Sequence, residues 1–149
     1  MSQQKRLANI VTNTKVNFES ISLRNKENSN DLKKIKNDGW RYTFIDFSLE
    51  NPEANALRDE YFLIQIFDLD NNQVVPMNEY NPGFPDSPQG STGYLFQHTG
   101  KPVSVRYINT QLKQGSNYQV RLFYYKDKMV FPLRNGIQDI VKNGEVVAR

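Results

Sequence analysis

The sequence predicts an all-β domain built as a two-layered antiparallel sandwich. Apolar and polar residues alternate with a period of two in short segments from residue 15 onward. Turn-forming residues separate these segments, and about eight or nine short strands follow from the pattern. Strands do not alternate with long helical segments, and no fixed period repeats, which argues against a parallel α/β arrangement.

The N-terminal residues predict a short helical segment before the domain. Leu7, Ile10 and Val11 share one face at helical spacing. We therefore expect residues 1–13 to form a helical tail or linker and residues 14–149 to form one sandwich domain. A length of 149 residues fits a single domain.

The first strand is predicted to contain an irregularity. Val16 and Phe18 alternate with polar residues, whereas Ile21 and Leu23 resume the alternation one position out of phase. Such a change predicts a kink or a β-bulge near Ser20. A polar, basic loop follows this strand.

The later strands are predicted from alternation, apolar runs and turn residues. The segment GWRYTFIDFSL has apolar groups on both faces, and YFLIQIF is the most apolar run, so both are expected near the middle of the fold. Asn135 and Gly136 predict a turn, and Asn143 and Gly144 predict a type I′ hairpin turn. The strands are expected over residues 39–49, 61–67, 74–75, 94–98, 103–108, 118–125 and 129–133, and residues 137–147 are expected to form a terminal hairpin.

Two strand–turn–strand segments resemble hairpins or late strands of known sandwich domains. Residues 64–75 read IQIFDLDNNQVV, and residues 115–122 read GSNYQVRL. They are similar to segments of immunoglobulin-like, fibronectin-like and transthyretin-like domains, over roughly residues 14–133. The resemblance implies this sandwich fold and transfers no functional residue. The cysteine pair of true immunoglobulin domains is absent.

Charge is distributed unevenly along the chain, whose net charge is +3. Residues 1–40 carry 8 basic and 4 acidic groups, residues 41–98 carry 2 and 9, and residues 99–149 carry 9 and 3. Surface turns explain such a pattern without any function. The sharper hypothesis is a bipolar surface that steers a charged partner or stacks head to tail with a copy of itself.

The chain is poorly supplied with catalytic groups. The absence of cysteine excludes disulfides, thiolate catalysis and cysteine-ligated metals. His98 is the one histidine, and no G-x-S-x-G nucleophile motif occurs. Asp46 lies inside an apolar strand, where a hydrogen-bonded structural role explains it better than catalysis does. We expect no enzyme, and keep a small hydrolase that uses His98 as a general base as one alternative.

One segment partly matches a calcium-binding loop. Asp68, Asp70 and Asn72 have the spacing that lets alternating oxygens converge on one ion. Gln73 occupies the position where that loop needs glycine, and Pro76 falls at a ligand position. A hairpin turn rich in Asp and Asn explains the same residues. We therefore expect no cofactor, and these three residues stay a weak candidate cation site.

The long loop over residues 76–92 is the predicted contact surface. Loops of this length often have a function, and Met77, Tyr80 and Phe84 supply apolar groups between prolines. Trp40 is a further candidate, because tryptophan favours interfaces and sugar platforms. The other interpretation of the loop is that Tyr80 and Phe84 fold back and cap one end of the sandwich.

These observations favour a non-catalytic interaction or scaffold module. We expect a protein partner or self-association, with carbohydrate as the alternative ligand. Nucleic acid is disfavoured, because Tyr107, Tyr118, Tyr124 and Tyr125 lie near cations but have a strand spacing that places most of them in the core.

The expected context is a soluble domain of a larger protein or assembly, such as a bacterial envelope or secretion component. No run of 18 apolar residues predicts a membrane span, and the first residues are too polar for the core of a signal peptide. The sequence leaves open whether the chain is cytoplasmic or belongs to an envelope protein.

Overall fold

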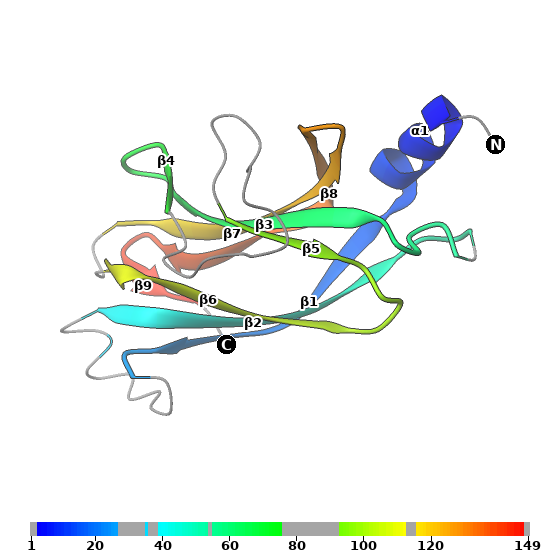
Figure 1. Cartoon of the computed structure of the whole chain (residues 1–149). Helices are drawn as coiled ribbons and strands as arrows, with labels where there is room; N and C mark the ends of the chain where they lie inside the picture. The colour runs from blue at the N-terminus through cyan, green and yellow to red at the C-terminus, as the bar shows by residue number, and fades with distance from the viewer. Residues whose placement is uncertain are drawn as a thin grey trace.

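The computed structural model describes residues 3–26, 35, 39–53, 55–75, 93–112 and 116–147. Within these residues it contains one helix and nine strands, labelled in Figure 1. The all-β prediction is confirmed. The elements are α1 (Gln3–Asn13), β1 (Lys15–Arg24), β2 (Trp40–Glu50), β3 (Tyr61–Asp68), β4 (Gln73–Val75), β5 (Tyr94–Gln97), β6 (Val103–Leu112), β7 (Tyr118–Lys126), β8 (Met129–Lys142) and β9 (Glu145–Val146).

The strands form one curled mixed sheet, a half-barrel. Its order is β4-β3-β7-β8-β1-β2-β6, and β5 and β9 pair with β3 and β8 respectively. The described strand pairs are antiparallel except β1 and β8, which run parallel where Lys15 pairs with Arg134. The curl places β3, β5 and β7 over β1 and β2 (Figure 1). This arrangement does not confirm the finer prediction of an immunoglobulin-like, fibronectin-like or transthyretin-like sandwich.

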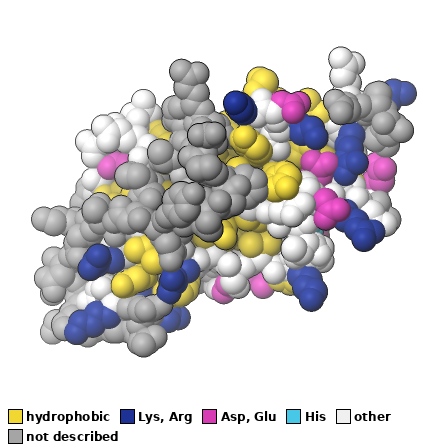
Figure 2. All heavy atoms as spheres, viewed as in Figure 1, with side chains coloured by type: hydrophobic (Ala, Val, Ile, Leu, Met, Phe, Trp, Pro, Cys, Tyr) yellow, Lys and Arg dark blue, Asp and Glu magenta, His cyan; other side chains and the backbone are white. Residues whose placement is uncertain are grey.

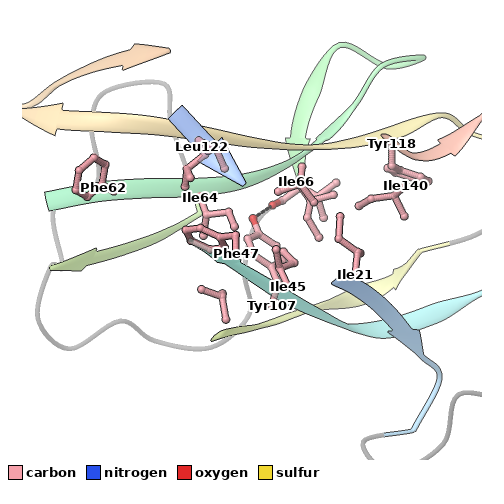
Figure 3. Close-up of a cluster of buried hydrophobic side chains, with 14 of the residues drawn as sticks. Ile21, Ile45, Phe47, Phe62, Ile64, Ile66, Tyr107, Tyr118, Leu122 and Ile140 are labelled. Atoms are coloured by element: carbon pink, nitrogen blue, oxygen red, sulfur yellow. Dashed lines mark hydrogen bonds between the residues drawn. The ribbon is translucent and has the colours of Figure 1, made fainter. Parts of the chain in front are cut away.

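The hydrophobic core fills the space between the two halves of the curled sheet (Figure 3). The rings of Phe47 on β2 and Phe96 on β5 join the halves, with centroids 5.8 Å apart. Removing such side chains from water is the main force that holds the halves together. The buried core residues in Figure 3 include Ile21, Ile45, Phe62, Ile64, Ile66, Tyr107, Tyr118, Leu122 and Ile140.

Two local predictions from the sequence are confirmed. The register between β1 and β2 shifts between Phe18 and Ser20, where the alternation changes phase. The β8–β9 hairpin turns at Asn143 and Gly144, whose φ angles are 54° and 78°. A type I′ turn needs positive φ at both central residues, and Asn-Gly adopts it readily.

The predicted turn at Asn135 and Gly136 is wrong, because β8 continues through both residues. The register with β7 shifts here, so that residues 133–136 of β8 stand opposite Leu122 alone. Asn135 has a φ of 55°, which asparagine tolerates better than most residues. The Asn-Gly pair therefore forms a bulge inside a long strand and does not end it.

The bulge brings backbone groups into close approach at Gly136. A Cβ atom at this position would lie 2.8 Å from the carbonyl oxygen of Leu122 and 2.9 Å from that of Leu133. The same bulge contains Arg134, which pairs with Lys15 of β1. The bulge therefore interrupts the β7 ladder, which continues on both sides of it, and at this interruption β8 pairs with the other half of the sheet.

We predict that Gly136→Ala lowers the free energy of unfolding by about 1–3 kcal/mol, the usual effect of forcing extra volume into a packed site. The added methyl group meets backbone carbonyls, which cannot move aside like the end of a flexible side chain. Urea denaturation measures the change. Gln138→Ala, at an exposed position of the same strand, is the control and should change stability by less than ~0.5 kcal/mol. A Gly136→Ala protein as stable as the control would contradict the close approach.

Candidate functional site

Strand β7 carries aromatic side chains on both of its faces. Successive side chains of a strand point to opposite sides, so the residues that do not enter the core point outward. The core-facing residues are Tyr118, Val120, Leu122 and Tyr124, and the outward, partly exposed residues are Gln119, Arg121, Phe123 and Tyr125.

Cross-strand pairing places further apolar residues beside the outward set of β7, although Leu63 and Gln65 of β3 on this side are themselves buried. Tyr125 pairs with Tyr61 of β3. Phe123 pairs with Leu63 of β3 on one side and with Pro132 of β8 on the other. We call this surface the aromatic face, and it comprises Tyr61, Phe67, Phe123, Tyr125, Val130, Pro132 and Ile137.

Large apolar side chains of β8 reach solvent at this surface and at the adjoining hairpin. Ile137 is 58% exposed, and Met129 at the β7–β8 hairpin is 59% exposed. Figure 2 shows hydrophobic side chains at the molecular surface around this hairpin. Scattered exposed apolar residues are ordinary, but a contiguous group of them is typical of a contact site.

The aromatic face also carries opposite charges at neighbouring positions. The guanidinium of Arg121 lies over the ring of Phe67, 3.8 Å from its centroid. Gln119 links the charges, because its Nε2 donates to Oδ1 of Asp139 at 3.0 Å and its Oε1 accepts from Nε of Arg121 at 3.3 Å. These contacts fix the orientation of the cation and the anion before any partner binds.

The structure leaves the predicted contact surface of the 76–92 loop as a prediction. Met77, Tyr80 and Phe84 lie outside the described residues. The prediction that Trp40 belongs to a contact surface is wrong, because its side chain is fully buried. Its Nε1–H donates to Oγ1 of Thr43 at 3.0 Å, and the register between β2 and β6 shifts next to it. The bulge lets Trp40 and Thr43 both point into the core, so Trp40 lines no surface.

Sequence reasoning missed the aromatic face because it assigned the β7 aromatics to the core. A signal was nevertheless present in the sequence. Phe123 and Tyr125 alternate with Leu122 and Tyr124, so large apolar residues occupy both faces of β7. A strand with one solvated face normally has polar residues at every second position. Its departure from that rule indicated a second apolar surface.

The ring of His98 makes hydrogen bonds to backbone groups. The N–H of Gly100 donates to Nδ1 at 3.3 Å, and the ring also makes a hydrogen bond to the backbone of Leu57. The side chain is buried and lies edge-on to Phe62, with centroids 6.0 Å apart. Burial lowers the pKa of His98 below 6.5, and the bond to Leu57 partly opposes this. A general base needs a nitrogen directed at a nucleophile, so this geometry favours a structural role.

Glu60 ties helix α1 to the sheet. One carboxylate oxygen lies 2.8 Å from the Arg6 guanidinium of α1, and the other accepts a hydrogen bond from the Tyr124 hydroxyl. Burial and the neighbouring Glu60 carboxylate raise the pKa of Tyr124 well above its usual range. Ile10, fully buried, completes the attachment of the helix. The three polar groups satisfy one another, so this cluster is an anchor for α1.

The carboxylate oxygens of the acidic β3–β4 hairpin accept hydrogen bonds from groups within the protein. Oδ1 of Asp68 accepts from the backbone N–H groups of Asp70 and Asn71, at 3.0 and 3.2 Å. Oδ2 of Asp70 accepts from the N–H of Asn117 at 2.7 Å, and Asn72 has the positive φ of a turn residue. These bonds explain the residues as a hairpin turn. Among the described residues, no group of three or more His, Asp or Glu is placed to hold a metal.

Comparisons with protein-family models, curated proteins and solved structures found no match. Within the part of the chain that the structure describes, no helix has the length and apolar character needed to cross a membrane.

We predict that the folded state loses stability as the pH falls below about 6.5, the ordinary pKa of histidine. In the unfolded chain His98 takes up a proton near this pH, whereas burial lowers its pKa in the folded state. Protonation therefore favours unfolding, and the loss is complete once the pH is below both values. Urea denaturation between about pH 7.5 and 5.5 measures it.

The control is His98→Gln, which removes the one histidine of the chain. This variant should lose the pH dependence in that interval, whatever its absolute stability. If the wild-type protein and the variant show the same dependence, other groups cause it and the assignment to His98 is wrong.

Proposed function

We propose that the chain is a non-catalytic scaffold module that associates with a second copy of itself through the aromatic face, as part of a larger protein or multi-subunit assembly. The observation that carries this proposal is the group of aromatic and aliphatic residues that the strand register brings together on the outer side of β3, β7 and β8. Ile137 within it is more than half exposed.

The composition of the aromatic face is that of an interface core. Tyrosine, phenylalanine and arginine are enriched in such cores, while lysine and glutamate are depleted. Aromatic side chains bury a large area for few rotatable bonds, so ordering them costs little entropy. Arg121 is already held over Phe67, which reduces that cost further.

A second copy is the favoured occupant because the face is complementary to itself. Arg121 and Asp139 are both bonded to Gln119 on the same surface. In a two-fold interface each surface meets an identical one, so the cation of one copy can face the anion of the other. A purely apolar partner would bury both charges without a counter-charge, which is unfavourable.

The alternatives have less support in the described residues. The carbohydrate hypothesis depended partly on Trp40, whose ring is buried and has no surface to offer a sugar. The hydrolase hypothesis depended on His98, whose ring makes hydrogen bonds to the backbone at Gly100 and Leu57. Neither observation affects the aromatic face, so the scaffold proposal remains the one that a surface feature favours.

The finer fold assignment is also a proposal. We propose that the curled sheet is a relative of the immunoglobulin-like, fibronectin-like and transthyretin-like sandwiches. Its two halves pack face to face around a shared core, as the two sheets of such domains do. The parallel pairing of β1 with β8 joins the halves into one sheet. The assignment would suit a module that is built into a larger chain or assembly.

We predict that the wild-type protein shows a concentration-dependent mass of twice its 17.3 kDa chain mass in light scattering after size-exclusion chromatography. Ile137→Asp should give the monomer mass at every concentration, because it places a charge in an apolar contact. The substituted side chain is exposed in the monomer, so thermal unfolding should show a stability change within about 0.5 kcal/mol.

The matched control is Val147→Asp, which introduces the same charge at another exposed apolar residue, 44% exposed and outside the aromatic face. This variant should associate as the wild type does. A wild-type protein that is monomeric throughout the dilution series, or equal disruption by both substitutions, would refute the proposed contact.

A further inference from the structure

A second outward surface lies on the opposite side of the molecule, over β1, β2 and β6 (Figure 1). In these strands Leu23, Ile45 and Val105 point into the core, so the alternate positions face outward. Phe44 of the central strand β2 is one of the outward residues. It pairs with Arg106 of β6, whose side chain is exposed.

Two arginines flank two aromatic rings on this surface. Tyr42 pairs with Arg24 of β1, and the guanidinium of Arg24 lies over the ring of Phe44, 4.3 Å from its centroid. Arg106 approaches Phe44 from the other neighbouring strand. We call this surface the arginine–aromatic patch, and it comprises Arg24, Tyr42, Phe44 and Arg106.

The surroundings of the patch favour a negatively charged ligand. Lys26 and Arg41 are exposed and lie close in sequence to Arg24 and Tyr42 of the patch. Figure 2 shows cationic side chains around hydrophobic ones at this end of the molecule. One carboxylate stands next to the patch along β2, that of Asp46. Its two oxygens already accept hydrogen bonds from the hydroxyls of Ser20, at 2.8 Å, and Ser104, at 2.5 Å. These hydroxyls leave the charge of Asp46 in place, but the four described cations at this end of the surface, Arg24, Lys26, Arg41 and Arg106, outnumber it.

We propose that the arginine–aromatic patch binds single-stranded nucleic acid. Guanidinium groups bind phosphate with paired hydrogen bonds, and bases stack on aromatic rings and on arginine planes. Tyr42 and Phe44 are two residues apart on one strand, so their Cα atoms are separated by about 6.8 Å. This is about twice the 3.4 Å rise per nucleotide of a stacked DNA strand, so each position can take its own base from a stretched strand.

An acidic polypeptide is the competing ligand, and the observations favour it less. Carboxylates would attract the two guanidinium groups but would not stack on the aromatic rings beside them. The residues involved also differ from those that the sequence suggested for nucleic acid. Tyr107, Tyr118 and Tyr124 are buried in the core, as their spacing predicted, whereas Tyr125 is partly exposed on the aromatic face. The patch is formed by β2 aromatics instead.

The test is fluorescence anisotropy with the whole chain and a labelled oligothymidylate of about 16 nucleotides, the upper range for one such site. We expect binding at low salt that weakens as salt rises. Arg106→Gln and Arg24→Gln should each weaken it by about tenfold. Together they should reduce the slope of log affinity against log salt by about 1.4, because each phosphate contact of a single strand contributes about 0.7.

The matched control is Arg58→Gln, which removes the same charge from an exposed arginine before β3 and should change affinity by less than about twofold. Arg106 is exposed, so its variant stays informative even if Arg24→Gln loosens β1. Absence of binding at low salt would overturn the proposal. So would an equal loss with Arg58→Gln, or polyglutamate binding as tightly as the oligothymidylate.

Discussion

Strand β8 has to pair with β7 and with β1 at once, and the two halves of the molecule face each other because it does. The bulge at residues 133–136 makes this possible, since it interrupts the β7 ladder locally where Arg134 meets Lys15, and the ladder resumes at Ile137. Gly136 is required there because neighbouring carbonyl oxygens occupy the space of a side chain. With the halves joined in this way, contacts such as that between Phe47 and Phe96 enclose the core.

A sheet curled around one core has outer faces, and both candidate surfaces lie on them. Side chains alternate along β7, so Tyr124 points into the core and Tyr125 lies on the aromatic face. On β2, Ile45 likewise points into the core and Phe44 belongs to the arginine–aromatic patch. The two surfaces lie on opposite sides, so a copy of the chain and a polyanion would not compete for one site. By contrast, His98 is engaged in holding the fold.

The local pattern of alternation, apolar runs and turn residues was sufficient to predict most strands, the bulge near Ser20 and the final hairpin, because each depends on local backbone preferences. It failed at Gly136, where pairing with two neighbouring strands overrides the turn preference of Asn-Gly. It also failed for Trp40, because a bulge and a hydrogen bond to Thr43 turn the ring inward. The aromatic face was missed because alternation places Phe123 and Leu122 on different faces of β7 but does not show which face packs against the core.

The account depends most on β8 joining both halves of the sheet. Nuclear Overhauser effects in the isotope-labelled protein test this directly. We expect backbone contacts between Lys15 and Arg134, together with ring contacts between Phe47 and Phe96. The rings of Phe62 and Tyr124 lie 5.5 Å apart within one half and serve as the internal reference. A spectrum that shows the reference contact but neither contact between the halves would contradict the curled sheet and both surfaces derived from it.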